Sequence, residues 1–239
     1  MPLSPSRYLP LVASIAIGVI PVAVLIACFG VPRKLILGWG ILSYVLGVAV
    51  LKLPIYHLFV VKVLHPRLGH KSLSAAQGIV SAVSELGSAA LFMVFVVPDM
   101  NAVQLIGFGV AAAAVEAVVL PFIGNPFEGT PLGEHASQVL ARSSSSRMIE
   151  WLGVVERVLV FLPHISARGL IYISIRSGTV YPAIIGVVLF AAIDGAGYFG
   201  HLSKWDFAQV RILTRFYAFL AIIGVAQSVC FALLYARFL

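Results

Sequence analysis

The sequence has few charged residues, few acidic residues in particular, and almost no cysteine. Only 10% of its 239 residues are charged and nine are acidic, whereas an ordinary globular chain is about 25% charged. This scarcity excludes a soluble catalytic domain and a disordered regulator, because both need a polar, solvated chain. Two cysteines are too few for a disulfide scaffold. Cys28 and Cys230 both lie in apolar runs, so we expect buried, free thiols.

Apolar residues dominate what remains. Residues of the AVILMFWYC set make up 61% of the chain, and the mean hydropathy is +1.04. A membrane-spanning helix needs about 20 consecutive apolar residues, and no run shows the strict alternation of a barrel strand. We therefore predict an all-α, polytopic membrane helical bundle that forms a single transmembrane domain over 1–239. Its seven expected spans cover residues 8–30, 35–61, 73–97, 103–123, 149–175, 180–200 and 207–236.

The second span and the longest connection carry distinct signals. Pro54 interrupts the second span and predicts a kink, because proline removes a helical hydrogen bond. Residues 124–148 separate the fourth and fifth spans. Their first half is rich in turn residues and they end in a serine tract, which predicts a loop or lid over one end of the bundle.

Basic residues predict the orientation of the chain. The net charge of +7 is spread over loops, which indicates contacts with lipid headgroups and not with nucleic acid. The side that holds the N-terminus carries Arg7, Lys62, Arg67, Lys71, Arg142, Arg147, Lys204, Arg211 and Arg215. The other side carries Arg33, Lys34, Arg176 and Arg237. The positive-inside rule then predicts a cytoplasmic N-terminus in a cell (plasma) membrane, although the Arg33–Lys34 pair argues the other way.

Four of the nine acidic residues lie inside predicted spans. A lone ionised group at the bilayer centre costs at least about 2.5–3.5 kcal/mol on insertion scales, so such groups face the bundle interior, pair or stay protonated. Alternating helix directions bring three of these acids and His201 into the half of the bundle nearer the 124–148 loop. We predict one polar cluster there. Its candidate site residues are Glu85, Glu116, Glu156, Arg157, His164 and Asp194, with Lys52 and Arg168 at similar depth.

Structural roles explain several of these residues equally well. Glu156 with Arg157, and Arg168 with an acid elsewhere, are candidate ion pairs between helices. Gly87, beside Glu85, is expected to permit close helix approach. The chain contains no HExxH, CxxC, GxSxG or P-loop pattern. We therefore expect neither a metal site nor a cofactor.

Four of the apolar segments resemble a known family in their order. The segment ERVLVFLPHISARGLIYISI (156–175) resembles the Glu-Arg…His helix of the YhfC-like family, which is placed with the glutamic-type, CAAX-processing-like intramembrane proteases. GVAAAAVEAVVL (109–120) is similar to its Gly- and His-containing helix ending in Glu-Ala. QGIVSAVSELGSAALF (77–92) is similar to its Glu-Glu-x-x-Arg helix, and VVLFAAIDG (187–195) to its His-x-x-x-Asp helix. The resemblance covers roughly 75–200 and implies that the six candidate residues belong to one intramembrane site.

The chain departs from the family at the positions that matter most for chemistry. Ser84 stands where the resemblance implies the Glu that activates water, and Ser88 where it implies Arg. Ala112 and Phe190 stand at the two His positions. Proteolysis by the family's route needs a carboxylate base and His or Arg donors for the oxyanion. Serine, alanine and phenylalanine supply none of these.

Three hypotheses follow from the sequence. In the first, the protein is a catalytically silent relative, an accessory or binding subunit whose cavity takes a lipid, a transmembrane protein partner or a membrane-embedded substrate. In the second, it is an active intramembrane endopeptidase with a rearranged site, in which Glu116 or Glu156 is the base and His164 with Arg157 holds the oxyanion. In the third, it is a seven-helix complex subunit or transporter with buried acids as proton or cation sites.

Overall fold

The structure is a computed structural model that describes residues 5–30, 34–123, 129–143 and 147–239. These residues form helices and no strands, so the predicted all-α bundle is confirmed. In this part of the chain, seven helices are long and apolar enough to cross a membrane. Outside the second span, the helices are α1 (Pro5–Phe29), α4 (His70–Phe95), α5 (Ala102–Ile123), α6 (Pro131–Ser143), α7 (Arg147–Ser177), α8 (Tyr181–Leu202) and α9 (Val210–Phe238).

The second span is one continuous but irregular helix. It begins as α2 (Lys34–Val45), continues as the π-helical segment η1 (Leu46–Lys52), passes through the short α3 (Leu53–Ile55) and ends as the π-helical segment η2 (Tyr56–Leu64). Pro54 lies in α3, between the two π-helical segments. Pro54 therefore lies where the helix is irregular, and the chain continues as a helix on both sides of it.

Helix α7 is the central element of the bundle. It is the most buried of the spans and packs against α1, α4, α5, α8 and α9. The most extensive contact between two helices is that of α4 with α8, and glycine residues lie at this contact. A Cβ atom at Gly78 would overlap the carbonyl oxygen of Ala191, and one at Gly195 would lie 3.0 Å from the carbonyl oxygen of Ser74. Gly87 has no neighbour at its Cβ position, so the prediction of a close contact there is wrong.

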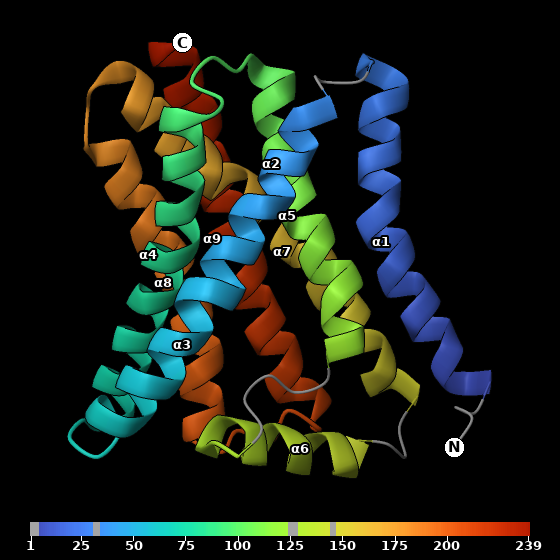
Figure 1. The fold of residues 1–239 in the computed structure, drawn as a ribbon. Coiled ribbons are helices and arrows are strands. Elements are labelled where there is room, and N and C mark those ends of the chain that lie inside the picture. The colour runs from blue at the N-terminus through green and yellow to red at the C-terminus, as the bar shows by residue number, and fades with distance from the viewer. Residues whose placement is uncertain (1–4, 31–33, 124–128, 144–146) are drawn as a thin grey trace.

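The second span diverges from α5 toward the end of the bundle that holds the N-terminus. Helix α2 packs against α5, whereas η1 packs against α4. Figure 1 shows α2 and α3 running to the lower left while α5 runs to the lower right. This divergence leaves room between the second span and α5, and the candidate site lies there.

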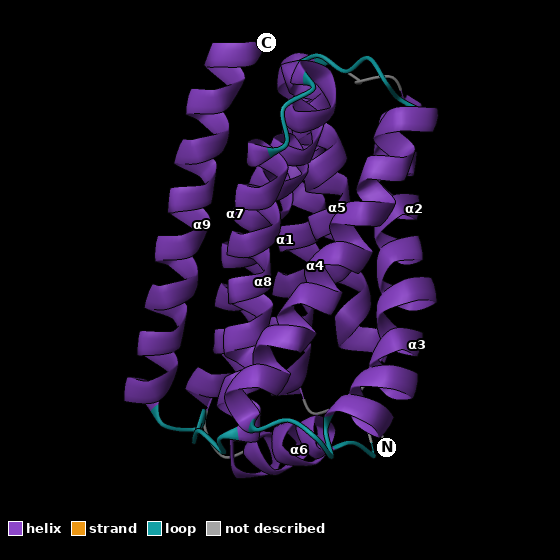
Figure 2. Ribbon diagram, turned by 90° about the vertical axis from the view of Figure 1, so that its left-hand side faces the viewer, coloured by secondary structure: helices purple, strands orange, loops and turns teal. Residues whose placement is uncertain are grey.

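Residues 131–143 form helix α6, so the prediction of a loop is wrong for this part of the 124–148 connection. Helix α6 lies crosswise over the end of the bundle near the N-terminus (Figures 1 and 2). Val139 packs with Phe207 and Leu213, whereas Glu134 and Gln138 are exposed. One face therefore covers the bundle and the other is polar, as in helices that lie in a membrane interface. Part of the serine tract, 144–146, lies outside the described residues.

Both cysteines are free, as predicted. Cys28 is nevertheless exposed, and Cys230 is half-buried. The prediction of burial is wrong for Cys28 because α1 stands at the edge of the bundle (Figure 1), where much of its apolar surface faces outward.

Candidate intramembrane site

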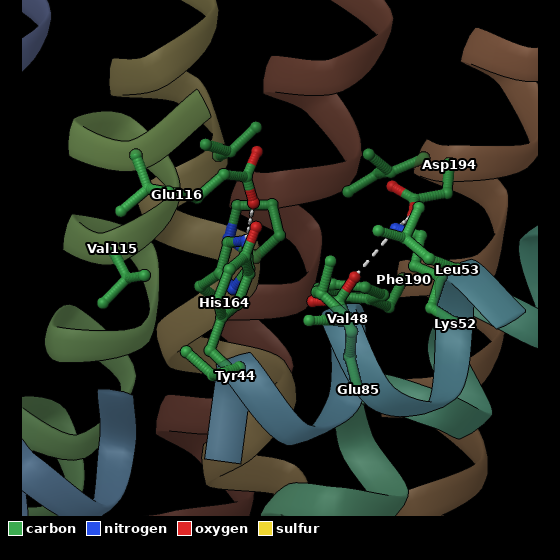
Figure 3. A pocket seen from close by; sticks show the side chains of 16 residues that line it. Tyr44, Val48, Lys52, Leu53, Glu85, Val115, Glu116, His164, Phe190 and Asp194 are labelled. Carbon is green, nitrogen blue, oxygen red and sulfur yellow. Dashed lines mark hydrogen bonds and ion pairs between the residues drawn. The ribbon is translucent and has the colours of Figure 1, made fainter. Parts of the chain in front are cut away.

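A cavity of about 310 Å³ lies between the second span and α5. Its walls also include residues of α4, α7 and α8, and most of them are apolar. Figure 3 shows Tyr44, His164 and Glu116 on one side of the cavity and Lys52, Glu85 and Asp194 on the other. The cavity is therefore apolar space bordered by two groups of polar side chains.

Lys52 joins three helices on its side of the cavity. Its Nζ lies 2.9 Å from Glu85 Oε1 and 3.0 Å from Asp194 Oδ2. The hydroxyl of Ser81 donates to the carboxylate of Asp194 and, at 3.4 Å, to Glu85 Oε1. The second span, α4 and α8 are thus connected by charge-assisted hydrogen bonds in a medium with little competing water.

Glu116 is held on both oxygens on the opposite side of the cavity. Its Oε1 accepts a hydrogen bond from Arg157 Nη1 at 2.6 Å, and its Oε2 lies 2.9 Å from His164 Nε2. Arg157 Nη2 also lies 3.6 Å from Glu156 Oε1, and Glu156 forms a hydrogen bond with Tyr217. The predicted ion pair between Glu156 and Arg157 is therefore present, but Glu116 is the closer partner of the arginine.

Arg168 connects the two groups of polar residues. Its side chain has no exposed surface, its Nη1 lies 2.7 Å from His164 Nδ1, and its Nη2 lies 3.7 Å from Glu85 Oε2. A guanidinium only donates hydrogen bonds, so His164 Nδ1 accepts and Nε2 carries the ring proton, which it donates to Glu116. We call the eight connected residues the polar network: Lys52, Glu85, Glu116, Glu156, Arg157, His164, Arg168 and Asp194.

The six candidate residues predicted from the sequence all lie in the polar network. Four of them line the cavity: Glu85, Glu116, His164 and Asp194. Arg157 lies behind Glu116. Lys52, Arg168 and the cavity residue Tyr44 complete the site and were not among the candidates. Lys52 and Arg168 could have been added to the candidates because each is a charged residue at membrane depth. Tyr44 could not, because a single tyrosine in an apolar helix is no sign of a site.

The four positions that depart from the YhfC-like pattern hold no reactive group against the cavity. The hydroxyl of Ser88 donates to the backbone oxygens of Ser43 and Glu85, at 2.7 and 2.8 Å. Ser84 and Ala112 are buried. Phe190 lines the cavity with its ring edge-on to His164, at a centroid distance of 5.5 Å. These side chains pack helices together and shape the cavity.

A second cavity of about 250 Å³ continues the first toward α6. Ala136 of α6, His201 and Glu156 line it, and His201 Nδ1 lies 3.0 Å from His135 Nδ1. The two cavities share Lys52, Glu116, Val160, Ile193 and Asp194, which define what we call the junction. Among the described residues, no group of three or more His, Cys, Asp or Glu side chains is placed to hold a metal ion.

Fold and site together define an integral, multi-pass helical membrane protein with a charged network beside an intramembrane cavity. No model of a known family matches the chain, and no curated protein or solved structure matches it. The chemistry of the cavity is therefore the basis for assigning a function.

Proposed function

We propose that the protein is a membrane-embedded binding protein whose cavity holds an amphipathic molecule of the bilayer, without cleaving it. One observation carries the proposal: an apolar cavity deep in the bundle is bordered by a network of charged side chains. Such a site matches a ligand that has both a polar end and an apolar chain. The polar end contacts the charged side chains, and the chain contacts the apolar wall of the cavity. In this role the protein serves a membrane partner as a binding or accessory subunit.

The position of the cavity supports entry from the bilayer. Ala49 and Val119 line the cavity and are exposed. They belong to the second span and α5, the two helices that diverge (Figure 1). A molecule dissolved in the membrane therefore reaches the polar network between these helices without crossing water.

The engagement of the acids argues against hydrolysis. A general base needs a free lone pair directed at the water that it activates. Glu116 accepts hydrogen bonds from Arg157 and His164, and Glu85 contacts Lys52 and faces Arg168 across 3.7 Å. The charged partners of both acids hold them in place within the polar network and away from a water. The motif-bearing helices α4, α5, α7 and α8 all contribute to the cavity wall. This arrangement supports the proposal of a YhfC-like, intramembrane-protease-like fold without catalytic activity.

An active intramembrane endopeptidase is the second candidate. The observation in its favour is the 2.9 Å contact between Glu116 and His164 beside the cavity, because a carboxylate next to an imidazole is a common proton-transfer pair in hydrolases. Incubating the purified chain with membrane-spanning peptides tests this candidate. We expect no cleavage, and a product that disappears in Glu116→Gln would replace our proposal with the peptidase.

We also propose that the α6 end of the bundle faces the cytoplasm of a cell (plasma) membrane. Lys62, Lys204, Arg211 and Arg215 lie at or near this end. Arg176 and Arg237 lie at the other end. The positive-inside rule favours the first end as cytoplasmic, and the N-terminus shares it (Figure 1).

Ligand binding is tested by native mass spectrometry of the chain in dodecyl maltoside micelles. The probes are three amphiphiles with one chain length: dodecylammonium, dodecanol and dodecanoate. Ala49→Trp places an indole in the cavity mouth, whereas Val188→Trp adds the same group to an exposed position of α8 that lines neither cavity. We expect the wild type and Val188→Trp to retain at least one probe, and Ala49→Trp to lose it. Retention by Ala49→Trp, or no adduct on the wild type, would refute the proposal.

A further inference from the structure

We infer that the ligand is an amphiphile with a positively charged ammonium head, which sits at the junction of the two cavities, and with a single apolar chain that leaves along α5. This inference rests on the proposed binding function and names its ligand class. Three independent features support it. They are the charge balance of the polar network, an unpartnered hydroxyl in the cavity, and an apolar groove that adjoins the cavity at Val115 and Val119.

The polar network holds more acids than permanent cations. Lys52, Arg157 and Arg168 are positive, and His164 is neutral because its Nδ1 accepts a hydrogen bond from Arg168. Against these three charges stand four carboxylates: Glu85, Glu116, Glu156 and Asp194. With every carboxylate ionised, four minus three leaves one negative charge uncompensated. An unpaired charge inside a membrane protein is costly, so a bound cation stabilises this arrangement.

The excess charge lies at one place in the network. Lys52 and Arg168 offset Glu85 and Asp194 on one side of the cavity. On the other side, Arg157 alone faces both Glu116 and Glu156. Glu116 and Asp194 both line the junction, and Glu156 lines the adjoining cavity. An ammonium group at the junction therefore lies beside Glu116 and Asp194, whose partner Lys52 also lines the junction. The side chains of Asp194 and Glu156 are 29% and 37% exposed, so a ligand can reach them.

The cavity also holds an unpartnered polar group. Tyr44 is 7% exposed and lines the cavity, and its hydroxyl makes no hydrogen bond to the described residues. Figure 3 shows its side chain beside His164 and Glu116. The hydroxyl oxygen is not fully buried and opens on the cavity space, where a ligand can reach it. The N–H groups of an ammonium, or a hydroxyl next to it, supply a partner at this position.

An apolar groove gives the chain of the ligand a path. The groove has a volume of about 490 Å³, lies between α1, α2 and α5, and is lined entirely by apolar residues. Val115 and Val119 line both the groove and the cavity, so the two adjoin at α5. Along α5 the groove extends from Val119 to Ala111, which at 1.5 Å per residue is about 12 Å.

The test compares the three dodecyl probes by titration in the same native mass spectrometry experiment. Dodecylammonium compensates the one unpaired negative charge of the network, whereas dodecanol does not. It is therefore expected to bind about tenfold more tightly than dodecanol. Dodecanoate adds a negative charge and is expected to bind most weakly. Glu156→Gln is expected to abolish the preference for dodecylammonium over dodecanol. Asp99→Asn removes a carboxylate from an exposed ion pair with Arg176 at the opposite end of the bundle, and is expected to keep the preference.

Two further variants separate folding defects from ligand chemistry. Tyr44→Phe deletes only the hydroxyl and is expected to weaken the dodecylammonium preference while dodecanol still binds. Val119→Trp fills the passage to the groove and is expected to weaken all three probes. Equal binding of the probes, tightest binding of dodecanoate, or a preference unchanged in both Glu156→Gln and Tyr44→Phe would overturn the inference and leave the proposed binding function intact. Absence of any bound probe would instead refute the binding function itself.

Discussion

Arg168 is a charged side chain without exposed surface, and it lies between the two halves of the polar network. It contacts His164 at 2.7 Å and faces Glu85 at 3.7 Å. A buried pair is not by itself a source of stability, but deleting one partner leaves the other charge without compensation. The stability of the fold is therefore expected to depend on this residue far more than on surface ion pairs.

Arg168→Met tests this dependence against Arg176→Met. The first change leaves Glu85 with only Lys52 as a charged partner, and we expect a loss of about 3–5 kcal/mol in the free energy of unfolding. Arg176 forms an exposed pair with Asp99, for which a loss of about 0–1 kcal/mol is typical. Unfolding by SDS in mixed micelles measures both. Similar losses in the two variants would contradict the central position of Arg168.

The two acids nearest Arg157 are expected to differ in the same assay. Glu116 has both oxygens engaged, at 2.6 and 2.9 Å, and its side chain is 16% exposed. Glu156 has one ion pair at 3.6 Å and is more exposed. Glu116→Gln is therefore expected to lower the melting temperature in detergent clearly more than Glu156→Gln does. The opposite order would show that Glu156 is the main partner of Arg157.

Among the elements, α4 and α8 approach each other through glycine. A Cβ at Gly78 would overlap the carbonyl oxygen of Ala191, whereas Gly87 on the same helix has open space. Gly78→Ala is therefore expected to destabilise the protein by about 1–3 kcal/mol, because packed helices must separate. Gly87→Ala is expected to be neutral or to stabilise by about 0.5–1 kcal/mol, since alanine favours a helix. Thermal unfolding of the two variants checks this, and equal losses would argue against close packing at Gly78.

Some of the helices could be predicted from the sequence and others could not. Apolar runs of sufficient length predicted the seven spans, because a helix is the way to satisfy the backbone in hydrocarbon. Helix α6 was missed, since it lies within a connection rich in turn residues and packs on Phe207 and Leu213, which are far away in the sequence. The π-helical segments on either side of Pro54 were missed as well, because residue periodicity does not distinguish them from an α-helix.

The sequence predicted that the six candidates gather in one polar cluster, and it predicted one of their contacts, the Glu156–Arg157 pair. The cost of a charge in the membrane was enough to single out the six candidates, and all of them lie in the polar network. Which charges meet depends on helix rotation and depth, which hydropathy does not fix. Lys52 contacts Asp194, a residue 142 positions away, and no local sequence pattern predicts such a contact.

At the scale of the whole molecule, the orientation in the membrane is a direct prediction. Asp99 is exposed at the end opposite α6, and Gln138 is exposed on α6. In a chain whose Cys28 and Cys230 are replaced by serine, Asp99→Cys is expected to react with a membrane-impermeant maleimide on intact cells. Gln138→Cys is expected to react only after permeabilisation. The reverse labelling pattern would place α6 outside and contradict the assignment based on basic residues.

The cavity gives the whole molecule its proposed role, since five of the membrane spans contribute to its wall and the polar network connects them. The most direct test is an electron cryomicroscopy map of the chain in lipid nanodiscs that contain dodecylammonium. We predict continuous density that begins at the junction beside Glu116 and Asp194, passes Val119 and enters the apolar groove. A map that resolves these side chains but has no density between them and the groove would contradict the account.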